Sequence, residues 1–204
     1  MKIKSKAMGE YQTNCYIVET TVGEFIIDPG MGAVSWVTQN VSKPIAILNT
    51  HGHFDHVWSN AKISKTLNIP IYCPKDDVFM LSRNQFGMDM EISVADFDVE
   101  PDSEFNFEGV KVKFHFFPGH TPGCSAIEIE EDDDSKLFSG DFIFHGSIGR
   151  VDFPYSNPKE MVQSIDKILK WERDIDIYCG HGPATKLSYE RKNLVAWLGY
   201  LNKV

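Results

Sequence analysis

The most informative motif of the chain is Thr50-His51-Gly52-His53-Phe54-Asp55-His56, which directly follows the apolar run Pro44 to Asn49 (PIAILN). It places three histidines and one aspartate within six residues, whereas the whole chain of 204 residues has seven histidines. A nearly continuous apolar run is typical of a strand buried on both faces, so these polar residues stand where a strand ends. Imidazole and carboxylate groups bind zinc, iron or manganese. We predict that His51 and His53 converge on one ion, and that the Asp-His pair ending the stretch turns toward a second.

Three later segments repeat this context, with a histidine or aspartate just beyond a predicted strand. They are Pro118-Gly119-His120-Thr121-Pro122-Gly123, Phe138-Ser139-Gly140-Asp141 and Cys179-Gly180-His181-Gly182-Pro183. Glycines beside each candidate ligand allow the backbone to approach an ion closely. We therefore expect His120, Asp141 and His181 to complete the metal site.

The rest of the chain alternates strand-like and helix-like segments without a linker rich in Pro, Gly or Ser, which favours one domain. The predicted elements are hairpins at Cys15–Glu19 with Glu24–Asp28 and at Ser125–Glu130 with Lys136–Ser139, a helix at Ser59–Asn68, a helix capped by Asn157 and a final helix capped by Ser188. The turn between the strands of the second hairpin, Glu131 to Asp134, is either a cation site or a solvated turn, and we favour the turn.

Two other segments carry specific expectations. From Val110 to Phe117 apolar residues alternate with Lys111, Lys113 and His115, so we expect a strand with His115 exposed on its polar face. The stretch from Asp76 to Asn106 holds Phe79, Met80, Phe86, Met88 and Met90. We interpret it as core and loop, with one wall of a substrate site as the alternative.

Composition limits the class of protein. Hydrophobic residues make up 42% and charged residues 24%, which excludes a disordered chain. The net charge of −9 repels phosphate backbones, so nucleic acid is not expected as a partner. Apolar runs are too short for a membrane helix, and the basic N-terminus lacks the apolar segment of a signal peptide. We expect a cytoplasmic protein with no membrane partner and with four reduced cysteines that bind no metal.

These motifs resemble the metallo-β-lactamase fold superfamily, in its glyoxalase II-like (hydroxyacylglutathione hydrolase-like) branch. The resemblance runs from Thr13-Asn14-Cys15-Tyr16 and Ile27-Asp28-Pro29-Gly30 through the candidate ligands to Gly182-Pro183-Ala184-Thr185 and Glu190. It implies an α/β fold (α+β in some schemes), a four-layer αβ/βα sandwich whose metals lie at one edge between the sheets. One domain would span residues 1–204, as two similar halves that meet near residues 105–110.

The resemblance also implies a ligand set, carried over by motif. His51, His53 and His120 match the first metal site, Asp55, His56 and His181 match the second, and Asp141 matches the bridging carboxylate. Zinc-type β-lactamases commonly lack a counterpart of His56 and have cysteine in place of Asp141, so antibiotic hydrolysis is disfavoured. The expected cofactors are two divalent ions, zinc first, with iron or manganese as alternatives.

The function implied is hydrolysis of a small thioester, such as a hydroxyacylglutathione, by a metal-bound hydroxide that Asp55 orients. A thiolate leaves without a strong general acid, and no candidate acid stands out in the motifs. The alternative is a mononuclear iron persulfide dioxygenase of the same fold, with iron bound by His51, His120 and Asp141. A nuclease is disfavoured by the charge.

One cation stands near the predicted site. Arg150, in the segment Gly146 to Phe153, either meets the substrate's carboxylate or forms a structural ion pair with Asp152. His145 is not required as a ligand, and Cys124 is interpreted as packing. Only 19 residues follow Thr185, whereas full-length hydroxyacylglutathione hydrolases continue into a helical domain that supplies much of the glutathione site. We therefore expect the thiol portion of the substrate to be recognised loosely.

Overall fold

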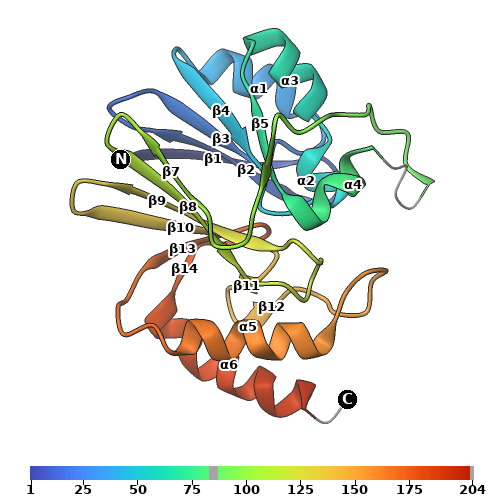
Figure 1. The fold of residues 1–204 in the computed structure, drawn as a ribbon, viewed down its shortest axis with the longest axis vertical. Coiled ribbons are helices and arrows are strands. Elements are labelled where there is room, and N and C mark those ends of the chain that lie inside the picture. The colour runs from blue at the N-terminus through green and yellow to red at the C-terminus, as the bar shows by residue number, and fades with distance from the viewer. Residues whose placement is uncertain (83–86, 203–204) are drawn as a thin grey trace.

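Two six-stranded sheets pack face to face in a computed structural model that describes residues 1–82 and 87–202. Figure 1 shows α1 and α3 on the outer side of one sheet and α5 and α6 on the outer side of the other. The order of layers is helices, sheet, sheet, helices, which confirms the predicted four-layer sandwich.

The first sheet has the strand order β1-β2-β3-β4-β5-β6, in which β1 to β3 are antiparallel and β3 to β6 are parallel. Its strands are β1 (Lys2–Met8), β2 (Thr13–Glu19), β3 (Glu24–Ile27), β4 (Pro44–Leu48), β5 (Ile71–Pro74) and β6 (Phe97–Val99). The run PIAIL of β4 is central in this sheet, and its last three residues are buried, as expected for a strand covered on both faces.

The second sheet has the order β14-β13-β10-β9-β8-β7, in which β10 and β13 are parallel and the other pairs are antiparallel. Its strands are β7 (Glu104–Phe107), β8 (Val110–Phe116), β9 (Ser125–Glu131), β10 (Asp134–Gly140), β13 (Asp176–Cys179) and β14 (Thr185–Lys186), and β11 (Ile143–Phe144) pairs separately with β12 (Ser147–Ile148). The chain passes from one sheet to the other between β6 and β7. The domain span and the boundary near 105–110 stay predictions.

The helices cover the sheets through three apolar clusters. They are α1 (Ala33–Asn40), α2 (Phe54–Val57), α3 (Asn60–Leu67), α4 (Val78–Leu81), α5 (Pro158–Leu169) and α6 (Leu187–Leu201), with the 3-10 helix η1 (Lys75–Asp77) before α4. Val37 and Ile63 pack on the first sheet, whereas Ile165 and Leu194 pack on the second. The third cluster, which includes Phe114, fills the space between the sheets.

Both predicted hairpins and the capped helix are present. β2 pairs with β3 and β9 pairs with β10, each in antiparallel register. Asn157 caps α5 because its side chain accepts from the backbone N–H groups of Lys159 and Glu160, and Pro158 occupies the first helical position. The helix expected over Ser59–Asn68 is α3.

Two local expectations are wrong. His115 is buried, because its ring packs against Trp171, and its Nε2 hydrogen-bonds to Glu128 at 2.6 Å. Ser188 does not cap α6, which begins one residue earlier. Its backbone N–H and its hydroxyl both bond to the carboxylate of Asp174, so the side chain ties the helix to the segment before β13.

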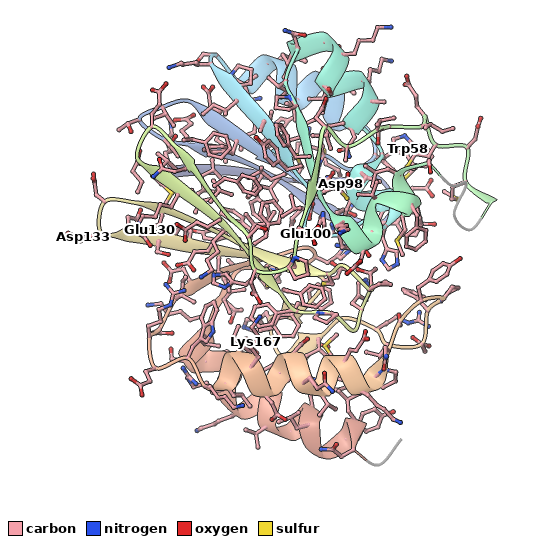
Figure 2. The ribbon with its side chains drawn as sticks, in the orientation of Figure 1. Trp58, Asp98, Glu100, Glu130, Asp133 and Lys167 are labelled. Atoms are coloured by element: carbon pink, nitrogen blue, oxygen red, sulfur yellow. The ribbon has the colours of Figure 1, made fainter. Side chains whose placement is uncertain are left out.

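The turn between β9 and β10 is exposed to solvent, as the sequence analysis predicted in preference to a cation site. Asp132 and Asp133 are exposed, and Figure 2 places Glu130 and Asp133 at the outer end of this hairpin. In the stretch from Asp76 to Asn106, Met80 is buried in the core, whereas Phe86 lies outside the described residues. All four cysteines are buried and free. None of the described helices has both the length and the apolar character needed to cross a membrane.

Glu128 holds a buried ion network on the second sheet. Its carboxylate accepts hydrogen bonds from His115 at 2.6 Å and from Arg173 at 2.5 Å. Burial acts to raise the pKa of Glu128, but these donors hold it well below the ordinary range. A depressed pKa means that the ionised carboxylate stabilises the fold above the unfolded pKa of about 4.3. That contribution is lost progressively as the pH falls toward the folded pKa.

We expect Glu128→Gln to lower the free energy of unfolding by about 2 kcal/mol at pH 7, because the Arg173 guanidinium loses its charged acceptor. The loss should be smaller at pH 3, where the unsubstituted protein has itself lost part of this contribution. Urea denaturation at both pH values measures the difference. Glu130→Gln on the same strand removes only an exposed pair with Lys111 and should cost less than about 0.5 kcal/mol. Equal losses at pH 3 and pH 7 would contradict the assignment.

Candidate metal centre

The predicted site residues all lie just beyond strand ends, at the edge where the two sheets meet. The loop after β4 and the start of α2 carry four of them, and the loops after β8, β10 and β13 carry one each. The chain reaches this edge from both sheets, so residues distant in the sequence become neighbours. The structure brings all seven together: His51, His53, Asp55, His56, His120, Asp141 and His181.

Three histidines form the first group. One ring nitrogen from each of His51, His53 and His120 lies within 4.8 Å of the other two. His53 Nδ1 and His120 Nε2 are 2.9 Å apart. Three ring nitrogens gathered in this way can hold one ion.

The second group combines a carboxylate with two histidines. His56 Nε2 lies 3.3 Å from His181 Nε2 and 3.6 Å from Asp55 Oδ2. His181 Nε2 lies 3.4 Å from the same oxygen of Asp55. These three atoms also lie close enough to share an ion.

Asp141 stands between the two groups. Its Oδ1 is 3.3 Å from His56 Nε2, and its Oδ2 is 3.4 Å from His120 Nε2 and 3.5 Å from His181 Nε2. One carboxylate therefore contacts a member of each group, which is the position that a bridging ligand needs.

Two buried atoms at this position have no hydrogen-bond partner among the described residues. They are His51 Nε2 and Asp141 Oδ1. A buried polar atom without a partner costs about 1–3 kcal/mol, so such atoms commonly mark a place for an ion or ligand. With five imidazoles and two carboxylates, the donor set suits a dinuclear site for divalent metals.

The electrostatics of the site favour positive charge. Burial acts to lower the pKa of His56, but neighbouring carboxylates, Asp141 first, raise it well above its usual range. Burial also acts to lower the pKa of His181, and its hydrogen bonds with Asp141 and Asp55 raise it to about 9. Burial acts to raise the pKa of Asp141, yet His56 holds it well below the ordinary value. The carboxylates thus stabilise cations placed among them, whether protons or metal ions.

Asp28 supports the site, although the sequence analysis assigned it no role there. Its Oδ1 accepts the backbone N–H of Thr50 at 2.8 Å, and its Oδ2 accepts the hydroxyl of Thr50 at 2.6 Å. The same Oδ2 lies 2.9 Å from His56 Nδ1, which leaves Nε2 to face the site. Asp28 follows β3 directly, so its position beyond a strand end was the signal that could have found it.

Two further contacts orient candidate ligands. His120 Nδ1 lies 2.8 Å from the backbone carbonyl oxygen of Arg150. Since a carbonyl only accepts, the proton sits on Nδ1 and Nε2 is free to face the site. The hydroxyl of Thr13 donates to Asp55 Oδ2 at 2.6 Å.

Close backbone approach explains two of the glycines. A Cβ atom on Gly180 would lie 2.2 Å from Asp141 Oδ1, and one on Gly140 would lie 2.3 Å from Thr50 Oγ1. Gly140 also has a positive φ of 50°. These positions accept only glycine because a side chain would displace a candidate ligand or its support.

A cavity of about 470 Å³ opens over the site. Its floor consists of five candidate ligands, and its walls are Tyr11, Phe54, Phe144, Arg150 and Phe153. Arg150 Nε and Nη2 donate to the carboxylate of Asp152 at 2.9 Å and 2.7 Å, so the structural ion pair is present. Contact of Arg150 with a substrate stays a prediction.

Asp77 is hydrogen-bonded to two of the loops that carry candidate ligands, the loop after β4 and the loop after β8. Its Oδ2 accepts the backbone N–H of Gly52 at 2.9 Å and the hydroxyl of Thr121 at 2.6 Å. Its Oδ1 accepts the backbone N–H of Gly123 at 2.7 Å. Burial raises the pKa of Asp77 to about 6 despite these three donors. The loop of His51 and His53 is thereby fixed to the loop of His120.

Residues 8–181 match the family model described as the metallo-beta-lactamase superfamily. The match includes every candidate ligand from His51 to His181. The chain therefore belongs to the metallo-β-lactamase superfamily, as its motifs suggested.

Two curated relatives are similar over almost the whole chain. YqgX of Bacillus subtilis, described as a probable metallo-hydrolase, is 32% identical over 203 residues, covering 94% of this chain and 95% of its own. The hydroxyacylglutathione hydrolase GloC of Haemophilus influenzae is 30% identical over 207 residues, covering 95% and 96%.

Two solved structures have the same fold. The B3 metallo-beta-lactamase BLEG-1 has a TM-score of 0.84 and 28% identity, covering 94% of this chain and 97% of its own. TTHA1623 in a di-iron-bound form has a TM-score of 0.79 and 30% identity, covering 93% and 98%.

We expect Asp77→Ala to destabilise the protein by about 3 kcal/mol, because two buried N–H groups and one hydroxyl lose their acceptor. The amide protons of Gly52 and Gly123 should exchange with solvent faster, since both loops are released. Chemical denaturation and hydrogen exchange measure the two effects.

Asp76→Ala is the matched control, because Asp76 is exposed and adjacent in the same 3-10 helix. It should leave both measurements nearly unchanged. Equal behaviour of the two variants would show that Asp77 does not hold the loops.

Proposed function

We propose that the protein is a dinuclear metal-dependent hydrolase that cleaves a small thioester. The observation that carries the proposal is the unpartnered, buried pair of atoms, His51 Nε2 and Asp141 Oδ1, among seven imidazole and carboxylate donors. Five of these donors form the floor of an open cavity, so an ion held there would be accessible to a substrate.

In this proposal the residues fall into two ligand sets. His51, His53 and His120 hold one ion, Asp55, His56 and His181 hold the other, and Asp141 contacts both. When bound, two divalent ions would polarise a substrate carbonyl and lower the pKa of water toward about 7. Zinc is the first expectation, and the di-iron form of TTHA1623 makes iron the leading alternative.

Asp55 is the proposed catalytic residue of the chain itself. The hydroxyl of Thr13 donates to its Oδ2, and Asp55 lines the cavity, where its carboxylate would accept a hydrogen bond from a water molecule. A carboxylate fixed in this way orients the water for attack on a carbonyl carbon. Burial acts to raise the pKa of Asp55, but His56 lowers it to about 2, so Asp55 is ionised at neutral pH.

The cavity walls favour a thioester over an amide. Apart from the candidate ligands, the described residues of the wall are four aromatic residues and Arg150, with no carboxylic acid or histidine that could protonate a poor leaving group. A thiolate, with a pKa near about 8.5, leaves without that help. Similarity to the hydroxyacylglutathione hydrolase GloC supports the same class of substrate.

β-Lactam hydrolysis is the second candidate, because BLEG-1 is a B3 metallo-beta-lactamase with a TM-score of 0.84. The resemblance of the motifs to the glyoxalase II-like branch ranks it second to thioester hydrolysis. This chain is 28% identical to BLEG-1 and 30% identical to GloC, which is nearly the same. A direct assay therefore decides between β-lactam hydrolysis and thioester hydrolysis.

The ligand sets predict a graded response of metal content. Asp141→Asn should weaken binding of both ions, because one carboxylate contacts both groups. His53→Ala should weaken mainly the first ion. Elemental analysis of protein dialysed against excess zinc should find about two ions in the unsubstituted protein, fewer than one in Asp141→Asn and about one in His53→Ala.

His145→Ala serves as the control, because His145 is exposed and stacks on Tyr189 rather than on a ligand. It should retain two ions. One ion in the unsubstituted protein under metal-rich conditions would count against the dinuclear proposal.

The substrate proposal is tested by offering lactoylglutathione, glutathione persulfide and a cephalosporin to the same preparation, loaded separately with zinc and with iron. Release of free thiol from lactoylglutathione without oxygen uptake is the expected result. Oxygen uptake with iron and the persulfide, without thioester cleavage under either metal, would favour the dioxygenase instead. Cephalosporin cleavage alone would favour the β-lactamase.

A further inference from the structure

The cavity above the metal centre has an aromatic wall on both sides. Phe153, in the segment before α5, lies with its ring centroid 5.9 Å from that of His53 and 6.1 Å from that of His120. Phe144, on β11, lies 5.9 Å from His181. One phenylalanine therefore packs beside each of the two proposed ligand groups.

A second aromatic pair extends this wall. Tyr11, in the turn between β1 and β2, packs edge to face on Phe54 at 5.0 Å. Phe54 is nearly buried at the start of α2, whereas the side chain of Tyr11 is 48% exposed. Such partly exposed rings offer apolar surface to a bound molecule.

The positive charge of the cavity wall, on Arg150, is already paired with a carboxylate. Arg150 is the cation among the described residues of the cavity, and Asp152 holds its guanidinium with two hydrogen bonds. The guanidinium carbon also lies 4.2 Å above the ring of Phe153. Apolar contact is therefore the larger source of binding energy for a substrate portion that lies next to the metal ligands.

We infer that the preferred substrates carry an aromatic or branched apolar acyl group. This inference rests on the proposed thioesterase function. Both substituents of the thioester carbonyl, the acyl group and the thiol portion, lie near the cavity wall when the carbonyl reaches the ligands, and we assign the acyl group to the space beside Phe144 and Phe153. Stacking and burial of a phenyl group there should raise kcat/KM by about tenfold or more over an acetyl group.

The test compares acetyl and phenylacetyl thioesters of glutathione on the zinc-loaded protein, and then both acyl groups on N-acetylcysteamine. The phenylacetyl compounds should be cleaved at least about tenfold better on both thiols, mainly through a lower KM. A preference that follows the thiol instead of the acyl group would overturn the inference while leaving the hydrolase intact.

Phe153→Ala and Phe144→Ala should each reduce the ratio of phenylacetyl to acetyl kcat/KM by about three- to tenfold. Acetyl thioester turnover should change less, since the smaller acetyl group offers the rings less apolar surface to contact. Tyr155→Ala is the matched control, because Tyr155 is exposed two residues away and contacts Phe79 outside the cavity. An unchanged ratio in both phenylalanine variants would contradict the inference.

A binding measurement separates this inference from the proposed function. Calorimetry with acetate and phenylacetate needs no turnover, and phenylacetate should bind at least about tenfold more tightly to the zinc-loaded protein. If no thioester is cleaved but phenylacetate binds preferentially, the thioesterase proposal fails and the aromatic acyl site stands. Equal binding of the two acids would overturn the aromatic site itself.

Discussion

The site buries negative charge, and every buried carboxylate in it needs a cation or a hydrogen-bond donor. Asp28, Asp55 and Asp141 lie at one sheet edge with almost no exposure, and an unpaired buried carboxylate costs several kcal/mol. The first two are satisfied within the chain, Asp28 by Thr50 and His56, and Asp55 by Thr13 and His181. Asp141 keeps one oxygen without a hydrogen bond among the described residues. A cation between the two groups is stabilised most at that carboxylate.

Such a centre needs the two sheets to be held in fixed relation, and hydrogen bonds across the edge do this. Asn14 and Tyr16 on β2 donate from their side chains to the carbonyl oxygen of Cys179 at the end of β13. The backbone N–H of Asn14 also bonds to Gly180. Because these bonds precede His181 by only one or two residues, the first sheet sets where this ligand of the second sheet lies. Asp77 performs the same task for the loop of His120.

The candidate ligands could be predicted from sequence because each follows a strand and because four occur in one short stretch. The contacts that bury individual polar residues, such as His115 and Asp77, could not be predicted from the sequence. His115 alternates with lysines along β8 and suggested exposure, yet a partner distant in the sequence, Glu128, provides a charged acceptor that allows burial. Asp77 sits in a stretch without periodicity, and its three donors come from two separate loops. Whether a polar residue is buried depends on such partners, which a linear pattern does not contain.

The residues that would determine the class of reaction and those that would determine the choice of substrate come from different parts of the fold. The candidate metal ligands lie just beyond strand ends, where the sheets fix them. A hydroxyacylglutathione hydrolase and a B3 metallo-beta-lactamase are both similar to this chain over nearly its full length. The cavity wall has another origin. Tyr11 lies in the turn after β1, and Phe144, Arg150 and Phe153 all come from the segment between Asp141 and α5. The hydrogen bonds of that segment to a candidate ligand come from the backbone carbonyl of Arg150 and the hydroxyl of Ser156, which both bond to His120. The side chains of Phe144, Arg150 and Phe153 can therefore change without removing these bonds. Differences in substrate among proteins with this centre are therefore expected to concentrate there.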